Sequence, residues 1–456
     1  MEAKQMYRAQ LLAELALTRK RTRELITSLD EQQLDVPYHP GVNPPLWEMG
    51  HAAFFYEVFV FSLLDGDASF DPSMDDLWDS FHIDHQDRWR GDLFPGLEKT
   101  LAYFDHVYDK MAERIGRTLL TDRELYLCRY AIYHQNMHIE SLVWCRQTAG
   151  YAPPPGASFE RPAPGELQAS PLQGDAAVPA GEWLIGMPGE SEQYATEDFA
   201  FDAEKPRHAV SLGGFAISRC LVSNQEFVAF LEDGGYQKPE LWSFGGQKWL
   251  RTETDMAHVC GSAIPLLQTP QHPLYWRWHE GQWQERLFDQ WQPLKLDAPV
   301  THVSYWEAEA YCCWAGRRLP TEQEWEAAAL GNRLGEPFRR YPWGNELPDD
   351  THADMNASGM AQNSVADYPA GDSPFGGRQM IGTVWEWTSS QFLPYDGFRV
   401  DMYPFMSTLQ FGDHKVSRGG SCATSSCLIR GTYRQAYLPQ RTDVYTGFRT
   451  CALTES

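Results

Sequence analysis

The chain has 456 residues and a net charge of −24, and 43% of its residues are hydrophobic and 13% aromatic. A chain of this length exceeds what one hydrophobic core usually serves, so we expect two domains. The negative charge argues against a nucleic-acid partner, because a polyanion would be repelled. No segment approaches the roughly 18 consecutive apolar residues of a membrane span. Nine cysteines without an apolar signal segment indicate reduced thiols, so we expect a cytoplasmic protein without membrane partners.

The first part of the chain, residues 1–150, is predicted to be helical. Four leucines give a rough helical stripe near the start: Leu11, Leu12, Leu15 and Leu17. The segment LEKTLAYFDHVYDKMAERI repeats the pattern, and strand-like alternation is rare in this part of the chain. A helical bundle is therefore expected. Residues 151–177, which are dense in Pro, Gly and Ala, are predicted to form a linker.

Residues 178–456 have a different pattern, in which short apolar runs such as HAVSLGGFAISR alternate with turns. Three helices are expected within NQEFVAFLED, SYWEAEAYCCWAG and TEQEWEAAAL, the last with Thr321 as its N-cap. This texture predicts an irregular α+β domain with long loops, and such loops often carry function.

The sharpest local signal for a functional site is the segment YHQNMHIES. Its histidines, His134 and His138, stand four residues apart, so on a helix both imidazoles lie on one face. Two such histidines can supply two metal ligands, and a third must come from elsewhere. The best candidate is His51 in the apolar helical stretch NPPLWEMGHAAFFYEVFVF, where a metal would satisfy an otherwise costly buried imidazole. Taken alone, the histidine pair and His51 are each more typical of core packing than of a metal site.

Glu140 allows two interpretations from its place beside the histidine pair. As a metal ligand it would imply a different coordination geometry. As a hydrogen-bond partner it would orient an imidazole. Two residues beyond His138, it faces roughly 160–200° away around the helix, so we predict that it is not a ligand.

The order of motifs in both halves resembles one enzyme family. The N-terminal half has a Gly-His pair at His51 and a later His-x-x-x-His-x-Glu. The C-terminal half has VPAGEWLIG, FDAEKPRHAVSL, PVTHVSYWEAEAYCCWAGRRLPTEQEWEAAA, YPWGN, GTVWEWTSS, SRGGS and TGFRT in series. Together they resemble the ergothioneine sulfoxide synthases, which join a DinB-like four-helix bundle to a formylglycine-generating-enzyme-like (C-type-lectin-like) domain. The resemblance implies a two-domain α+β fold.

The resemblance also implies a chemistry. His51, His134 and His138 would hold iron(II) where the bundle meets the C-terminal domain, and O₂ would be used to join sulfur or selenium to the imidazole C2 of hercynine, a trimethylated histidine betaine. A three-histidine set leaves positions open on iron, as oxygen activation needs. The family uses a tyrosine as a proton donor near the oxygen, and the matching position in SSQFLPYDGF is Tyr395.

The chain departs from the family at the residues that meet the donor. Sulfoxide synthases that use γ-glutamylcysteine have Arg-Asn-Trp-Asp after the RGGS strand, where this chain has Arg434, Gln435, Ala436 and Tyr437. The carboxylate for the donor's ammonium is absent. The run YHQNMHIE, then CRQTAGY, and the ending DVYTGFRTCAL look most like the selenoneine synthases, which join hercynine to a selenosugar. Tyr437 would stack on or hydrogen-bond to that sugar.

Two arginines in DHQDRWRGDL, Arg88 and Arg90, could hold an anionic donor or could be solvated surface residues. Two alternative functions remain open. Formylglycine-generating enzymes bind copper through two cysteines after an RGGS strand, and SRGGSCATSSC offers Cys422 and Cys427, two residues closer to RGGS than expected. The C-terminal domain could also be a non-enzymatic ligand-binding module, which would leave the three histidines unexplained.

Overall fold

The structure is a computed structural model of the chain. It describes residues 2–117, 120–159, 172, 174–188, 199–250, 270–401, 403 and 406–453. These form two compact units. The first comprises Met1–Gly156, Gly189–Phe201 and Arg399–Tyr403, and the second Ala157–Pro188, Asp202–Phe398 and Pro404–Ser456. Within the described ranges, no helix is both long and apolar enough to cross a bilayer.

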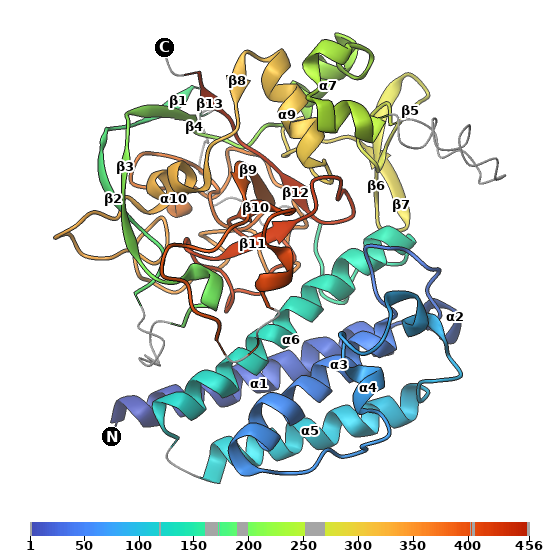
Figure 1. Cartoon of the computed structure of the whole chain (residues 1–456). Coiled ribbons are helices and arrows are strands. Elements are labelled where there is room, and N and C mark those ends of the chain that lie inside the picture. Colours follow the sequence, from blue (N-terminus) through green and yellow to red (C-terminus); the bar gives the residue numbers. More distant parts are fainter. Residues whose placement is uncertain are drawn as a thin grey trace. The chain divides into compact units, whose positions relative to one another are not determined.

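The first unit is a helical bundle, as the sequence predicts (Figure 1). Its elements are α1 (Glu2–Thr27), α2 (Glu31–Leu34), α3 (Pro45–Tyr56), the π-helix η1 (Glu57–Asp65), α4 (Asp75–Trp78), the 3₁₀-helix η2 (His85–Trp89), α5 (Leu97–Arg117) and α6 (Asp122–Ala149). The long helices pack in pairs, α1 against α5 and α6, and α3 against α5 and α6. This packing forms the bundle core.

Local sequence explains where α6 begins and ends. The Thr121 side chain caps its start, and the Glu124 carboxylate accepts from the Thr121 backbone N–H, which completes a capping box. Gly150 ends the helix with a left-handed φ of 70°. In α1, Leu11 and Leu15 are buried, but Leu17 is 46% exposed, so the predicted leucine stripe does not include it.

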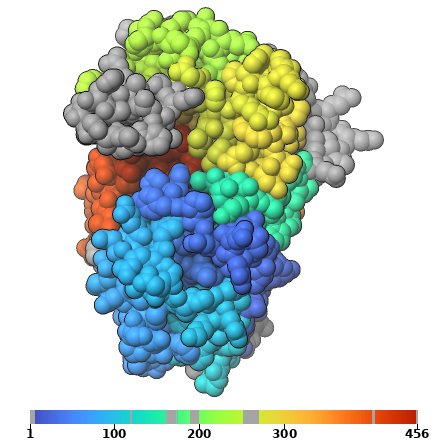
Figure 2. Space-filling view, turned by 90° about the vertical axis from the view of Figure 1, so that its right-hand side faces the viewer, coloured from blue at the N-terminus to red at the C-terminus, as the bar shows by residue number. Residues whose placement is uncertain are grey.

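The second unit mixes short strands and helices. Its strands are β1 (Asp175–Val178), β2 (Gly181–Ile185), β3 (His208–Leu212), β4 (Phe215–Ser218), β5 (Trp276–His279), β6 (Gln282–Leu287), β7 (Gln290–Pro293), β8 (Arg317–Arg318), β9 (Trp385–Gln391), β10 (Lys415–Arg418), β11 (Arg434–Tyr437), β12 (Thr446–Gly447) and β13 (Cys451–Ala452). They pair as β1-β4-β13-β8, β11-β10-β9-β12, β2-β3 and β5-β6-β7. The antiparallel β5–β7 meander forms part of the yellow surface in Figure 2.

The three helices predicted in this unit are present as α7 (Asn224–Glu232), α9 (Tyr305–Trp314) and α10 (Glu322–Leu330). Thr321 caps α10 as predicted, with Glu324 completing a capping box. Strand β1 begins at Asp175, inside the predicted linker, and most of the rest of that stretch, residues 160–171 and 173, lies outside the described residues. The eight cysteines that the structure describes are free, in line with reduced thiols.

Two later stretches of chain belong to the helical unit. Phe199 stacks on Tyr126, with ring centroids 5.1 Å apart, and Phe201 meets the edge of Tyr130 at 5.2 Å. The Tyr126 hydroxyl donates to the Ala200 carbonyl at 3.1 Å and is also hydrogen-bonded to Asp401. The bundle is therefore completed by residues far along the sequence.

Candidate metal centre

Three histidines converge inside the helical unit, as the sequence predicts. His51 lies on α3, and His134 and His138 lie one turn apart on α6. One ring nitrogen from each lies within 4.8 Å of the others, and the Nε2 atoms of His134 and His138 are 3.2 Å apart. That separation fits two ligands on one ion at about 2.1 Å each. A metal site in a protein usually has three or more His, Cys, Asp or Glu side chains with their ligand atoms close together. Among the described residues, these three histidines form such a group.

Hydrogen bonds fix the orientation of two of the three rings. The Nδ1 of His51 is 2.7 Å from the carbonyl oxygen of Trp78, which can only accept, so His51 carries its proton on Nδ1. The Nδ1 of His138 is hydrogen-bonded to the Glu48 carboxylate. Both rings therefore present the Nε2 lone pair, the arrangement usual for metal-binding histidines. The His134 ring is held by stacking on Phe55, with centroids 3.8 Å apart.

Packing explains why a glycine, Gly50, precedes His51. A Cβ at Gly50 would collide with the Trp78 ring, which lies against α3 at this point. Because the Trp78 carbonyl accepts from His51, the close approach of α4 to α3 orients this ligand. Glycine is therefore needed in the Gly-His pair for packing next to the site.

The electrostatic surroundings keep two of the rings neutral. Burial, together with the electrostatic effect of the neighbouring His138, lowers the pKa of His51 to about 3. Burial also lowers the pKa of His134 well below its ordinary value, and the close approach of the His138 and His51 imidazoles adds to this effect. Neutral imidazole is the form that binds metals. Two of the three candidate ligands, His51 and His134, are therefore held in the protonation state that metal binding requires.

Glu48 is a carboxylate that the sequence analysis missed. It lies on α3 and is 1% exposed, yet it accepts hydrogen bonds from His138, from Asn43 at 2.8 Å and from Ser141 at 2.7 Å. Burial alone raises its pKa, but the charge of His138 and these bonds outweigh burial and lower the pKa to about 2. Glu140 is buried on α6 but is not part of the histidine group.

A second missed residue is Tyr403, which belongs to the helical unit. Its ring packs edge-on against Phe55 and Phe59, with centroids 5.3 and 5.0 Å away, and lies 6.4 Å from His134. Its hydroxyl is 3.5 Å from the hydroxyl of Ser80. Burial raises the pKa of Tyr403 to about 12, so the phenol keeps its proton at neutral pH.

Tyr395, the predicted catalytic tyrosine, belongs to the other unit. It is buried in a core cluster with Trp183 and Trp325, and the Arg434 guanidinium lies 4.0 Å over its ring. Its hydroxyl is buried and has no hydrogen-bond partner among the described residues. Burial raises its pKa. The catalytic role of Tyr395 stays a prediction. Within the helical unit, the Tyr403 ring lies beside His134.

The two arginines predicted to bind the donor differ in their surroundings. Arg88 donates to the side-chain oxygen of Asn43 at 2.8 Å and to the Ser80 carbonyl at 3.1 Å. Its guanidinium lies 4.0 Å over the ring of Trp47. Arg90 is exposed and pairs with Asp92 at 3.0 Å. Arg88 is thus half-buried and hydrogen-bonded within the helical unit, and Arg90 is a surface residue.

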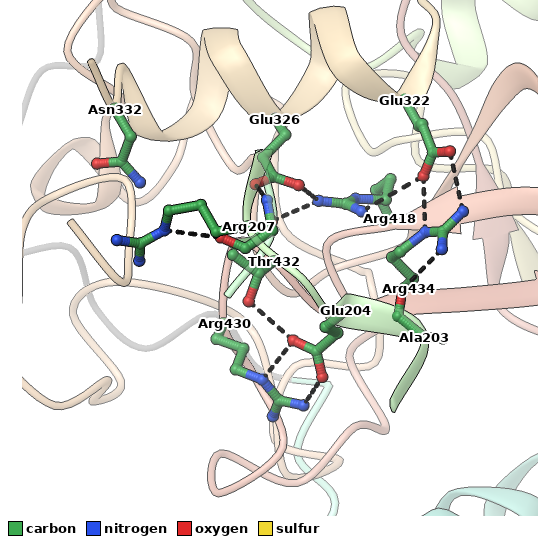
Figure 3. Close-up of polar contacts among 12 residues, drawn as sticks. Ala203, Glu204, Arg207, Glu322, Glu326, Asn332, Arg418, Arg430, Thr432 and Arg434 are labelled. Carbon is green, nitrogen blue, oxygen red and sulfur yellow. Dashed lines mark hydrogen bonds and ion pairs between the residues drawn. The ribbon is translucent and has the colours of Figure 1, made fainter. Parts of the chain in front are cut away.

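Arg434 lies in a buried ion-pair network of the second unit (Figure 3). Its guanidinium donates to both carboxylate oxygens of Glu322 at 2.8 and 2.9 Å. It also donates to the carbonyls of Ala203 at 2.7 Å and Leu393 at 2.9 Å. These contacts give Arg434 a structural role, which its sequence position did not reveal. Its predicted contact with substrate stays a prediction.

The next residues of this strand were also predicted to meet substrate. Gln435 is half-buried, with its side-chain oxygen 3.2 Å from the neighbouring backbone N–H. Tyr437 is 6% exposed, and its ring meets those of Trp385 and Trp387 edge-on. The Arg441 guanidinium lies 5.7 Å from the centre of the Tyr437 ring. The second unit thus holds Tyr437 in an aromatic cluster.

The cysteines of the alternative copper site are both in the second unit. Cys422 is fully buried, and Cys427 is half-buried. The Cys422 backbone N–H donates to the Thr383 carbonyl at 2.9 Å, and its carbonyl accepts from Ala357 at 2.7 Å. The three-histidine group of the first unit includes neither thiol.

Known protein families match both parts of the chain and so define its class. Residues 14–142 match the DinB superfamily, and residues 161–453 match the sulfatase-modifying factor enzyme 1-like domain. A formylglycine-generating enzyme from Thermomonospora curvata is 32% identical over 305 residues, 59% of this chain and 93% of the relative. The chain is therefore a two-domain α+β protein in which a DinB-type bundle is joined to a sulfatase-modifying-factor-type domain, as expected.

Full-length similarity identifies the family. The hercynine oxygenase of Mycolicibacterium smegmatis is 33% identical over 453 residues, which cover 97% of this chain and 98% of the relative. That of Mycobacterium tuberculosis is 33% identical over 445 residues, 96% and 98% of the two chains. The chain belongs to the hercynine oxygenase family.

Proposed function

We propose that this protein is a non-haem iron(II) enzyme that uses O₂ to join a selenosugar to the imidazole C2 of hercynine, forming a carbon–selenium bond. Similarity to hercynine oxygenases over nearly the whole chain supports hercynine as the substrate. The observation that carries the metal assignment is the convergence of His51, His134 and His138. Iron(II) held by these histidines would supply the activation of O₂.

The chain's own groups prepare this site. The Trp78 carbonyl and the Glu48 carboxylate hold two imidazoles with Nε2 facing inward. Aromatic rings pack around the third, which excludes water from that side of the site. Tyr403 is a neutral phenol beside His134, so it can deliver a proton to a substrate group.

Replacing Glu48 with glutamine is expected to weaken iron(II) binding by about 10- to 100-fold, the usual effect of losing a partner of a metal-binding histidine. Glutamine has one oxygen, whereas Glu48 accepts from His138, Asn43 and Ser141 at once. Anaerobic titration against a competing chelator measures the affinity. Glu140→Gln, on the other helix that carries ligands, is the matched control and should keep wild-type affinity. Loss of iron in the control alone would assign the carboxylate role to Glu140.

The choice of donor rests on charge. A zwitterionic thiol such as γ-glutamylcysteine needs a carboxylate for its ammonium, and the chain has Tyr437 where the related thiol-using enzymes have that carboxylate. An unpaired ammonium in a partly desolvated site costs on the order of 1–3 kcal/mol, which is roughly ten- to a hundredfold in affinity. A sugar-linked selenol has no ammonium, so this cost is absent.

The second candidate function is sulfoxide formation on hercynine with cysteine or γ-glutamylcysteine, for which the similarity to hercynine oxygenases likewise supports the substrate. Turnover with hercynine, O₂ and competing selenium and sulfur donors, followed by mass analysis of the product, separates the two. We expect the selenosugar to exceed γ-glutamylcysteine by at least about tenfold in kcat/KM. Tyr437→Asp should shift the preference toward the thiol, with Tyr437→Phe as the control for loss of the ring's hydroxyl. A wild-type preference for the thiol would make the protein an ergothioneine-type enzyme.

A further inference from the structure

Arg88 contacts the side chains behind two of the three histidines. It lies on η2, outside the histidine group, and its contacts run in two directions. One set of contacts is a chain of hydrogen bonds, and the other is a stack of planar side chains. Each ends on a different histidine, His138 on α6 and His51 on α3.

The hydrogen-bond chain ends on His138. Arg88 donates to the side-chain oxygen of Asn43 at 2.8 Å, which fixes the orientation of that amide. The amide nitrogen of Asn43 then points to Glu48 and donates at 2.8 Å. Glu48 in turn is hydrogen-bonded to Nδ1 of His138. Without the arginine, the Asn43 amide could turn over and present its oxygen to Glu48, where two acceptors would repel each other.

The stacked chain ends on His51. The Arg88 guanidinium lies 4.0 Å over the ring of Trp47. The His51 imidazole also stacks on this ring, parallel to it within 8° and with centroids 4.7 Å apart. Trp47 is 2% exposed, and its indole N–H donates to the Leu77 carbonyl at 3.0 Å. The Arg88 guanidinium thus packs on the Trp47 ring, and the Trp47 ring packs on the His51 imidazole, so the guanidinium helps to fix the position of that imidazole.

We propose that Arg88 is a positioning residue for the metal centre, which holds His138 through Asn43 and Glu48 and holds His51 through Trp47. This inference rests on the proposed metal-binding function of the three histidines. It gives Arg88 a role distinct from binding the carboxylate of a donor. A planar guanidinium suits this role, because it donates at its edge and stacks on its face at the same time.

The test measures anaerobic iron(II) affinity of the full-length protein without hercynine or donor. Arg88→Met keeps the length of the side chain but removes its donors and its charge, and it should weaken binding about tenfold or more, since outer partners of metal ligands are usually worth about 10- to 100-fold. Arg88→Lys should give an intermediate affinity, because an ammonium can donate to Asn43 but cannot also stack as a plane. Arg90→Met, a surface arginine two residues away, should match the wild type.

A double-mutant cycle tests the route. Asn43→Ala breaks the hydrogen-bond chain and leaves the stack on Trp47. Combined with Arg88→Met, its effect on affinity should be smaller than in the wild-type background, because both changes interrupt one path. The absorption spectrum of the cobalt(II)-loaded protein should also change in Arg88→Met, which a purely structural role would not cause. The unfolding midpoint of the metal-free variants reports any general loss of fold.

Each outcome has one meaning. A wild-type protein that binds no iron(II) overturns the proposed metal site itself. Wild-type binding with equal affinity and an equal cobalt(II) spectrum in Arg88→Met and Asn43→Ala overturns the positioning role. If Arg88→Met then raises only the KM for the donor, Arg88 binds the donor instead. If Arg88→Met fails to fold, additive effects of Asn43→Ala and Arg88→Lys on affinity would likewise contradict the inference.

Discussion

Alanine in place of His138 is expected to abolish iron(II) retention and turnover. The change removes one of three ligands and also leaves the Glu48 carboxylate, which is 1% exposed, without its imidazole partner. Partners behind a ligand are already worth about 10- to 100-fold in affinity, so loss of the ligand itself should exceed about a hundredfold. Metal content after anaerobic loading and gel filtration measures the retention, and product formation measures the turnover.

The matched control is His82→Ala. His82 lies in the same unit, is 61% exposed and pairs with Asp79 on the surface. Removing it deletes an imidazole without touching the site, so iron content should equal that of the wild type. Full iron occupancy and an unchanged rate in His138→Ala would show that His51, His134 and His138 do not form the metal centre.

Phenylalanine at position 403 is expected to slow product formation by about 10²- to 10⁴-fold, the range of a positioned proton donor, while iron(II) affinity stays at the wild-type value. The change keeps the ring that packs on Phe55 and Phe59 and removes only the hydroxyl. Turnover under saturating hercynine, donor and O₂ measures the effect. A parallel assay of donor oxidation detects diversion of O₂ from bond formation.

Tyr395→Phe provides the comparison, because it tests the tyrosine that the resemblance indicates. The Tyr395 hydroxyl is buried without a partner in the described part of the chain, so its removal should cost little stability. A large loss of rate in Tyr395→Phe with normal turnover in Tyr403→Phe would return the proton-donor role to Tyr395.

The grouping of the three histidines could be predicted in large part because its signals are local. The i, i+4 spacing of His134 and His138 places them on one helix face whatever surrounds them. Glu48 carries a local signal as well, since it stands one turn before His51 on the same helix, but the sequence does not say which histidine it meets. The Gly50 requirement could not be inferred, because it depends on the position of the Trp78 ring.

The residues and contacts that sequence reasoning missed depend on pairs of positions that are distant in the sequence. Tyr403 reaches His134 from a segment far along the chain, and no spacing rule links the two. Arg434 follows a family pattern, but its donors meet the buried carboxylate of Glu322, on a helix in another part of the sequence. Motifs identify the residue types of a site. Which partner each charged side chain meets depends on the tertiary packing of the chain.

The discontinuous make-up of the helical unit has a consequence for protein synthesis. Helices of the bundle make mostly local contacts and fold rapidly. At about 5–20 residues per second, the ribosome reaches Tyr403 on the order of ten seconds or more after α6 is complete. A nascent chain that ends just after α6 already carries His51, His134 and His138. It still lacks Tyr403 and the aromatic residues Phe199 and Phe201. If the proposed metal site is correct, the three histidines could bind their ion during translation before Tyr403, the proposed proton donor, has been synthesised.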